Sequence, residues 1–160
     1  MQTLLIVEDE KLIRKGIAAM ASRSSVHIDE IIECRNGEEA MEILKSRKID
    51  TVFMDIRMPK MDGLGFIQEA GKRFSDTHYI IISAYDDFNY AVEMLKHGVF
   101  DYVLKPVKRE TIEELLVNLE KKQQKNQKDQ DIGQIQNKIS IPPFRQLSCN
   151  KIRDFQMGHY

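Results

Sequence analysis

The chain has 160 residues, which is enough for one domain with a substantial core and a leftover segment, and too short for a two-domain enzyme. Hydrophobic residues make up 42% and charged residues 31%, as in soluble globular proteins, and the formal net charge of -1 gives no argument for or against a polyanionic partner. The charge is unevenly divided: residues 121–160 carry eight Lys or Arg and three Asp, a net of +5, which leaves -6 for residues 1–120. The sequence therefore predicts an acidic domain with a basic tail.

No apolar run is long enough to span a membrane, and the short run from Leu4 to Val7 stops at acidic residues with no basic segment before it. We therefore expect a cytoplasmic protein that makes no membrane contact. The two cysteines, Cys34 and Cys149, share no motif spacing and are expected to be inert thiols.

The chain begins with a predicted strand and helix. Residues Thr3 to Val7 are almost all apolar, as in a strand that is buried on both faces, and three acidic residues, 8–10, follow directly. The next segment is predicted to be a helix. The apolar residues assigned to its core face are Leu12, Ile13, Ile17 and Met20.

A second strand is predicted from Ile28 to Cys34. Asn36 can cap the helix that follows, and Glu38 and Glu39 suit the positive end of its dipole.

The third predicted strand covers residues 51–55 and ends on a carboxylate, Asp55. Pro59 interrupts regular structure, and the Asp62-Gly63 pair indicates a turn, so residues 58–63 are predicted to form a loop. A helix is predicted from about Leu64 to Phe74.

The last two predicted strands, His78 to Ser83 and Phe100 to Leu104, also lead to functional groups: the first ends on the Ser83 hydroxyl, and the second is followed by Lys105. Between them, Asp86 or Asp87 can cap a helix that ends near His97-Gly98. The residues assigned to its apolar face are Phe88, Ala91, Val92 and Leu95. Beyond Pro106, a final helix has the apolar residues Ile112, Leu115, Leu116 and Leu119.

Five strands that alternate with five helices predict an α/β fold, a parallel sheet with helices on both faces. In such sheets, ligands bind beyond the carboxyl ends of the strands, where the strand order reverses. The order cannot be read from one sequence, but the order 2-1-3-4-5 would bring Glu8 and Asp9 beside Asp55.

Three carboxylates that lie close together repel one another, so a positive charge must offset their negative charges. Two ionised carboxylates about 4 Å apart repel by roughly 4 kcal/mol at an effective dielectric near 20. Hard oxygen ligands favour Mg²⁺, which binds one or two carboxylates together with phosphate oxygens. Asp55 could then be a nucleophile toward a phosphoryl group, with Lys105 and Ser83 contacting the phosphoryl oxygens. Each residue alone could be an ordinary strand-end polar group, but four strands that lead to such groups favour a site.

Four stretches carry a resemblance to a known family: VEDE at 7–10, MDIRMPKMDG at 54–63, ISAY at 82–85 and YVLKP at 102–106. In order and spacing they resemble the motif set of bacterial two-component response-regulator receiver domains, over residues 1 to about 122. The resemblance implies the flavodoxin-like (CheY-like) doubly wound fold, with five strands in the order 2-1-3-4-5. It also implies phosphorylation of Asp55 by a partner sensor histidine kinase.

Carried over position by position, the resemblance makes Asp9 and Asp55 ligands of Mg²⁺, together with the backbone carbonyl of Arg57. Glu8 would complete the acidic pocket. In addition, Ser83 and Lys105 would contact the phosphoryl group, and Tyr102 would be the aromatic switch residue. The family also implies a cis bond between Lys105 and Pro106, which proline makes accessible. Arg57 and Tyr85 occupy positions that influence phosphoryl lifetime in the family.

Residues 83–91 are similar to receivers joined to AraC-type DNA-binding output domains, although Phe88 and Ala91 are equally explained as the core face of a helix. Only 38 residues follow Lys122, and they contain no recognisable DNA-reading module. We therefore divide the chain into a receiver domain, 1–122, and a basic polar linker or tail, 123–160, that extends the last helix and is then irregular. DNA binding would need an output domain that is absent from this chain.

The leading hypothesis is a phosphorylatable switch of a two-component phosphorelay, not an enzyme with an external substrate, which regulates transcription and dimerises on phosphorylation. One alternative is a stand-alone receiver that acts by protein contacts. Another is an aspartyl-nucleophile phosphatase, which would need an acid two residues after Asp55, where Arg57 stands. A flavodoxin-type electron carrier is disfavoured because residues 8–10 would repel a flavin phosphate.

Overall fold

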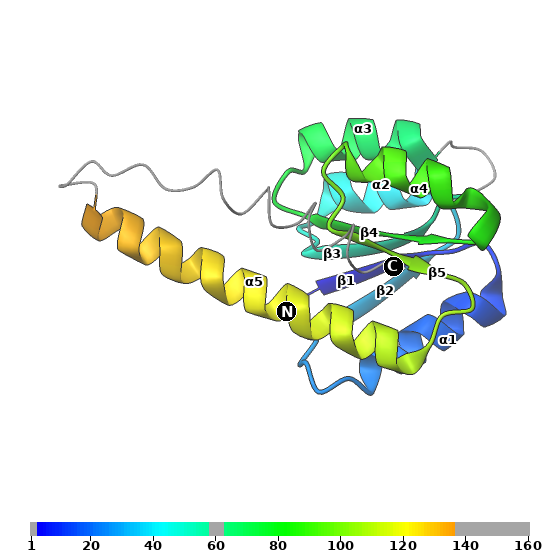
Figure 1. The fold of residues 1–160 in the computed structure, drawn as a ribbon, viewed down its shortest axis with the longest axis horizontal. Coiled ribbons are helices and arrows are strands. Elements are labelled where there is room, and N and C mark those ends of the chain that lie inside the picture. Colours follow the sequence, from blue (N-terminus) through cyan, green and yellow to red (C-terminus); the bar gives the residue numbers. More distant parts are fainter. Residues whose placement is uncertain (1–2, 58–62, 137–160) are drawn as a thin grey trace. The chain divides into compact units, whose positions relative to one another are not determined.

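The computed structural model describes residues 3–57 and 63–136, with side chains for all of these except 85 and 127–136. Five parallel strands form one sheet in the order β2-β1-β3-β4-β5, which confirms the predicted fold (Figure 1). The strands are β1 (Thr3–Val7), β2 (Glu30–Cys34), β3 (Thr51–Asp55), β4 (His78–Ser83) and β5 (Asp101–Leu104). Their near-continuous apolar sequences fit a sheet that is covered on both faces.

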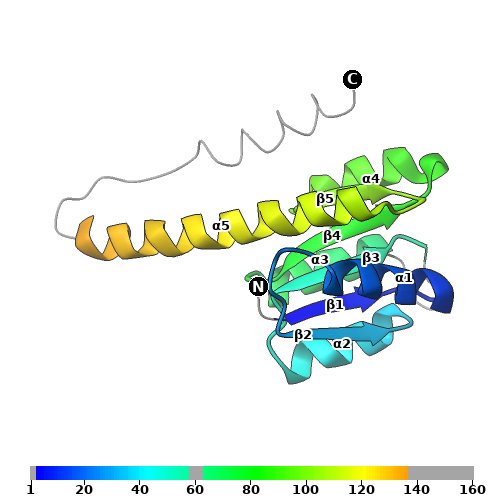
Figure 2. The same cartoon turned by 90° about the horizontal axis from the view of Figure 1, so that it is seen from below.

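Helices cover both faces of this sheet. Figures 1 and 2 show α1 and the part of α5 up to residue 120 on one face, and α2, α3 and α4 on the other. The helices are α1 (Lys11–Ser22), α2 (Gly37–Ser46), α3 (Gly63–Arg73), α4 (Phe88–Leu95) and α5 (Arg109–Gln136), and a short 3₁₀ helix, η1 (Tyr85–Asp87), precedes α4. None of the helices in the described part of the chain is long and apolar enough to cross a membrane.

The chain divides into two compact units, residues 1–120 and 121–160. Within the first, a core lies between the sheet and the helices α1 and α5. It contains the following buried residues: Leu4, Ile6, Ile17, Ala21, Phe53, Ile80, Ile82, Val103, Ile112, Leu115, Leu116 and Leu119. All four residues predicted for the apolar face of the last helix are thus buried. In the second unit, the structure describes the continuation of α5 to Gln136, and the predicted loop at 58–62 and the residues after 136 lie outside the described part of the chain.

The predicted core face of α1 was partly wrong. Leu12 is 88% exposed, whereas Arg14, Ile17 and Ala21 are buried. Leu12 lies five residues before Ile17, which places it about 140° away around a helix of 3.6 residues per turn.

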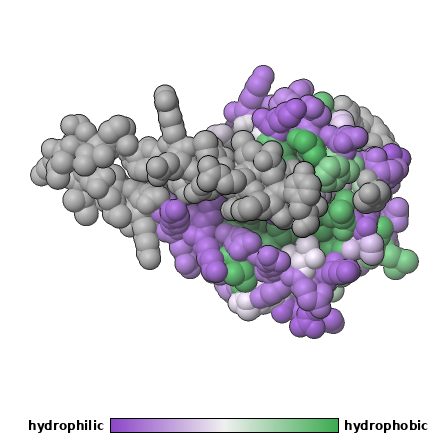
Figure 3. Space-filling model, in the orientation of Figure 1, coloured by the Kyte–Doolittle hydropathy of each residue, from purple (hydrophilic) through white to green (hydrophobic). Residues whose placement is uncertain are grey.

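In Figure 3, hydrophilic residues surround the visible face of the domain and hydrophobic ones gather nearer its middle.

Two further boundaries and one face differ from the predictions. β2 starts at Glu30 rather than Ile28, because its partner strand starts at Thr3, which lies opposite Glu30. β5 starts one residue after Phe100. On α4 the fully buried residues are Ala91 and Met94, and the other residues predicted for its apolar face, Phe88, Val92 and Leu95, are only partly buried. Asn36 caps α2 as predicted, since its side chain accepts a hydrogen bond from the Glu39 amide.

Gly63, the first residue of α3, lies too close to its neighbours for a side chain. A Cβ atom there would lie 2.8 Å from the Ile56 carbonyl oxygen and 2.9 Å from Met94 Cε. We therefore expect Gly63→Ala to lower the free energy of unfolding by roughly 1–3 kcal/mol, as overpacking does. Denaturant unfolding measures this change. Gly65→Ala on the same helix is the control, because nothing lies within 4 Å of its Cβ position and alanine favours helix; equal destabilisation by both substitutions would contradict the prediction.

Candidate functional site

The carboxyl ends of four strands bring the predicted site residues to one edge of the sheet. Asp55 is the last residue of β3 and Ser83 the last residue of β4, while Glu8 follows β1 and Lys105 follows β5. In the sheet register, Asp55 lies opposite Ile82, the residue before Ser83. The strand order β1-β3-β4-β5 therefore places these groups side by side without any special loop.

An acidic cluster forms at this edge. One carboxylate oxygen from each of Glu8, Asp9 and Asp55 lies within 4.8 Å of the other two. Glu8 is fully buried and Asp55 nearly so, whereas Asp9 is exposed. Oxygen atoms from three carboxylates are the donor set that a hard divalent cation prefers, so this cluster could hold a metal ion.

Lys105 supplies a positive charge to the cluster. Its Nζ atom lies 2.7 Å from Asp55 Oδ2 and donates a hydrogen bond to it, and it lies 3.6 Å from Glu8 Oε1. Burial alone would lower the pKa of Lys105, but the hydrogen bond and the charge of Asp55, with the charge of Glu8, outweigh it and raise that pKa. Lys105 is therefore a cation placed directly against the candidate nucleophile.

Glu8 is the most perturbed group of the site. Burial, then the charge of Asp55 and a hydrogen bond with it, raise the pKa of Glu8 from 4.5 to about 8, against the opposing charge of Lys105. Near neutral pH, Glu8 thus holds a proton in the metal-free protein. One of its oxygens, Oε2, is buried without a hydrogen-bond partner among the described residues. Such an atom is costly unless a cation or a donor binds it, which fits the carboxylate cluster of a metal site.

The Ser83 hydroxyl is the group predicted to contact a phosphoryl oxygen. Ser83 is fully buried, and its Oγ atom also has no hydrogen-bond partner within the described ranges. A hydroxyl can donate to an anionic oxygen. Its contact with a group bound on Asp55 stays a prediction.

Arg57 makes contacts that the sequence did not reveal. Its backbone N–H donates to Asp55 Oδ1 at 3.2 Å, and its guanidinium pairs with Asp86 at 3.2 Å and Asp87 at 2.7 Å. The cap predicted for α4 is accordingly wrong in its chemistry: Asp87 occupies the N-cap position, but its side chain makes no cap hydrogen bond. The available signal was that Arg57 and Asp87 follow β3 and β4, which turn out to be neighbouring strands. The role of the Arg57 carbonyl as a metal ligand stays a prediction.

Arg14 is a second residue that the sequence interpretation missed. It lies on α1, and its Nη1 atom donates to the Glu8 carbonyl oxygen at 2.9 Å, while Nε pairs with Glu33 at 3.3 Å. Arg14 thereby fixes the backbone that carries the acidic cluster. Its only sequence signal was a cation at helical spacing from Ile17, which is equally typical of a solvated helix face.

The switch residue and the predicted cis bond lie at the same edge of the sheet. Tyr102 is buried in β5, and its ring meets that of Phe88, at the start of α4, edge to face at 6.1 Å. The Lys105–Pro106 bond is cis, as predicted. An aromatic that touches α4 from β5 is placed to respond to movements of that helix, although the role itself stays a prediction.

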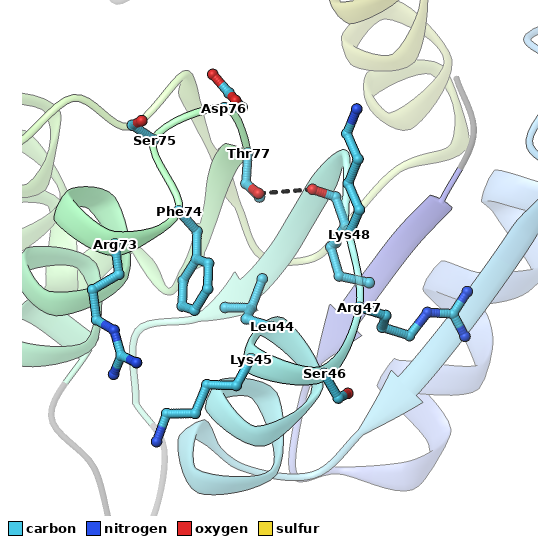
Figure 4. Close-up of a pocket in the computed structure, with 11 residues that line it drawn as sticks. Leu44, Lys45, Ser46, Arg47, Lys48, Arg73, Phe74, Ser75, Asp76 and Thr77 are labelled. Atoms are coloured by element: carbon cyan, nitrogen blue, oxygen red, sulfur yellow. Dashed lines mark hydrogen bonds between the residues drawn. The ribbon is translucent and has the colours of Figure 1, made fainter.

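A hollow of about 380 Å³ lies at the opposite end of the sheet, where residues 44–49 and 73–77 lead into β3 and β4 (Figure 4). Figure 4 shows Leu44 and Phe74 facing one another at its centre. Three of the cations that line it pair with acidic residues: Lys45 with Glu42, Arg47 with Glu30 and Arg73 with Glu69. Among the described residues, the cluster of carboxylates and the buried polar atoms without partners at Glu8 and Ser83 lie at the carboxyl edge, which is therefore the candidate site.

Comparison with known proteins agrees with this geometry. Residues 4–117 match the family described as the response regulator receiver domain. The chain belongs to this family. The receiver domain is 33% identical over 116 residues to the transcriptional regulatory protein HptR of Staphylococcus aureus, an alignment that covers 72% of this chain and 45% of that protein. It thus spans less than half the length of the curated relatives it matches.

Solved structures give the same result. The receiver domain of AraT, a response regulator from Geobacillus stearothermophilus, is 34% identical, with a TM-score of 0.69 and coverage of 78% of this chain and 97% of that one. A two-component transcriptional regulator AraC from Clostridium phytofermentans is 28% identical, with a TM-score of 0.70 and coverage of 81% and 99%. The receiver domain described here is therefore that of a two-component response regulator, and two of these relatives, HptR and the Clostridium phytofermentans protein, are named as transcriptional regulators.

Proposed function

We propose that this receiver domain accepts a phosphoryl group on Asp55 from a sensor histidine kinase in a Mg²⁺-dependent reaction. The observation that supports this most directly is the placement of Lys105 Nζ 2.7 Å from Asp55, at the centre of the acidic cluster. A carboxylate that lies beside a cation and two further carboxylates is suited to a reaction between two anions.

Mg²⁺ would be held by Asp9, Asp55 and the Arg57 carbonyl, with Glu8 completing the pocket, and when bound it shields the charges of the carboxylate and the phosphoryl group. In the transfer, an oxygen of Asp55 forms a bond to phosphorus while the bond between phosphorus and the donor nitrogen breaks. Lys105 then pairs with a phosphoryl oxygen, and the buried Ser83 hydroxyl donates to another.

The protein acts as a phosphoacceptor and not as an enzyme with an external substrate. Phosphorylation adds roughly two negative charges at Asp55. Drawing Ser83 inward would change the space around Tyr102, and so would carry the signal to the face formed by α4 and β5. A histidine kinase as donor places the reaction in the cytoplasm.

The output is transcription, through an AraC-type DNA-binding domain that is not part of this chain, with dimerisation on phosphorylation. Two observations support a transcriptional output: HptR carries the name transcriptional regulatory protein, and this chain spans 45% of HptR. The AraC-type domain is suggested by the likeness to the two-component transcriptional regulator AraC. A receiver that acts only through protein contacts is the other outcome. Extending the gene past the codon for Tyr160 and testing the longer protein for phosphorylation-dependent DNA binding separates the two.

The test of the proposed function is direct labelling. Incubation with Mg²⁺ and a small acyl phosphate should add one phosphoryl group per chain, and Asp55→Asn should remove the label. Asp76→Asn is the control, because Asp76 is an exposed carboxylate at the other end of the sheet and should leave labelling intact. Label that persists in Asp55→Asn would overturn the assignment.

A further inference from the structure

Arg14 is a buried cation at a place where a helix does not favour one. It is the fourth residue of α1, its side chain is 11% exposed, and the first turn of this helix contains no acidic residue. The positive end of a helix dipole disfavours a cation, and burial of the guanidinium adds a desolvation cost. The local sequence of α1 therefore does not account for Arg14, and contacts outside the helix must offset both costs.

One of these contacts holds the peptide group that joins two residues of the acidic cluster. Arg14 Nη1 donates to the carbonyl oxygen of Glu8 at 2.9 Å, and this hydrogen bond is buried. The carbonyl belongs to the planar peptide unit between Glu8 and Asp9, so its orientation helps to set the directions in which both side chains leave the backbone. The Glu8 amide, in turn, donates to the Cys34 carbonyl oxygen at 3.1 Å. The backbone at Glu8 is thus held both from α1 and from β2.

The other contact fixes the guanidinium itself. Arg14 Nε pairs with Glu33 Oε1 at 3.3 Å, while the second oxygen of the same carboxylate pairs with Lys15 at 2.9 Å. Glu33 lies on β2, and its side chain is 24% exposed. A planar guanidinium has donors in a fixed fork and can serve Glu33 and the Glu8 carbonyl at once, which the compact ammonium of a lysine does less well. Glu33 therefore offsets the charge of Arg14 and also directs Nη1 toward the backbone of Glu8.

We propose that Arg14 is a positioning residue of the Mg²⁺ site, which raises the affinity of the acidic cluster for the cation by fixing the peptide between Glu8 and Asp9. The inference rests on the proposed Mg²⁺ site. Groups that hold metal ligands in place without touching the metal typically change the affinity for the metal by about 10–100-fold. The charge of Arg14 acts in the opposite direction, because removal of a cation near the site would lessen the repulsion of Mg²⁺. Positioning and charge therefore predict opposite effects of replacing Arg14 by a neutral residue.

Calorimetric titration of the metal-free protein with Mg²⁺ measures the direction of the effect. Arg14→Met keeps the apolar stem and removes the donors, so the Kd for Mg²⁺ should rise about tenfold. Lys15→Met is the matched control, because it removes one positive charge from the same Glu33 carboxylate and leaves the hydrogen bond of Arg14 to the Glu8 carbonyl in place. Its Kd should stay within about twofold of the wild-type value. A Kd in Arg14→Met that is equal to or below that of the wild type, or an equal rise in Lys15→Met, would overturn the inference.

Arg14→Lys is a milder variant that keeps the positive charge and serves if Arg14→Met does not fold. A lysine ammonium cannot reproduce the fork that binds Glu33 and the Glu8 carbonyl together, so the Kd for Mg²⁺ should rise about threefold although the net charge is unchanged. A Kd equal to that of the wild type would show that the guanidinium geometry has no effect on Mg²⁺ binding, and the inference would be wrong.

The rate of labelling with a small acyl phosphate separates positioning from a loss of folded protein. In Arg14→Met, the Mg²⁺ concentration that gives the half-maximal rate should rise about tenfold, whereas the rate at saturating Mg²⁺ should stay near the wild-type value. A lower maximal rate at an unchanged half-maximal concentration would indicate a merely structural role and overturn the inference. Wild-type protein that binds Mg²⁺ but takes no label would overturn the proposed function and not the inference. Normal labelling of the wild type, with unchanged Mg²⁺ affinity in both Arg14 variants, would overturn only the inference.

Discussion

Replacement of Lys105 by methionine is expected to lower the free energy of unfolding of the metal-free protein by roughly 2–4 kcal/mol at pH 7. Lys105 lies 2.7 Å from Asp55 and 3.6 Å from Glu8, and the side chains of both acids are nearly or fully buried. Methionine keeps most of the apolar stem but removes the charge, so the Asp55 carboxylate is left buried without its cation. Urea unfolding in the presence of a chelator measures the loss.

Lys96→Met is the matched control for this experiment. Lys96 pairs with Glu93 at 3.1 Å, but both side chains are more than half exposed, and such pairs contribute at most about 1 kcal/mol. Mg²⁺ should also stabilise Lys105→Met more than it stabilises the wild type, because a divalent cation in the cluster replaces the missing charge. If Lys105→Met lowers the free energy of unfolding no more than Lys96→Met does, Lys105 does not offset the negative charge of the acidic cluster as the geometry indicates.

The location of the site could be predicted because it follows from strand ends. Asp55, Ser83 and Lys105 each lie at or just after the end of an apolar run, and a parallel sheet brings all such ends to one edge. No loop conformation had to be known. The strand order could not be derived from one sequence, and it entered through the resemblance to receiver domains.

The parts that could not be predicted depend on partners from distant segments. Leu12 and Arg14 lie on nearly opposite sides of α1, about 160° apart, and apolar periodicity alone favoured Leu12 for the core. Arg14 is buried because Glu33 and the Glu8 carbonyl satisfy its guanidinium, and both contacts exist only after β1, β2 and α1 have packed. Asp87 is a similar case. Local propensity favours a helix cap at this position, but its carboxylate instead accepts a hydrogen bond from Arg57, which lies 30 residues earlier.

The metal-free protein is expected to become less stable as the pH rises from about 4.5 to about 8, because of Glu8. Its pKa is about 8 in the folded protein and 4.5 in the unfolded chain, so between these values the folded state holds a proton that the unfolded state has lost. The stabilising contribution is fully present below pH 4.5 and is lost as the pH rises through 8. The loss is roughly 3–5 kcal/mol, measured by urea unfolding across this range with a chelator present.

The affinity for Mg²⁺ should increase with pH, whereas the stability of the metal-free protein decreases, because the cation must displace the proton of Glu8. Its affinity should rise by up to about tenfold per pH unit and level off above pH 8. In Glu8→Gln, both the free energy of unfolding and the affinity for Mg²⁺ should become nearly independent of pH over this range, since glutamine has no proton to lose. Asp9→Asn keeps Glu8, so it should retain the fall in metal-free stability while losing most of the stabilisation by Mg²⁺. A stability that is constant from pH 5 to 8 in the wild type, or that falls equally in Glu8→Gln, would contradict the assignment of the proton to Glu8.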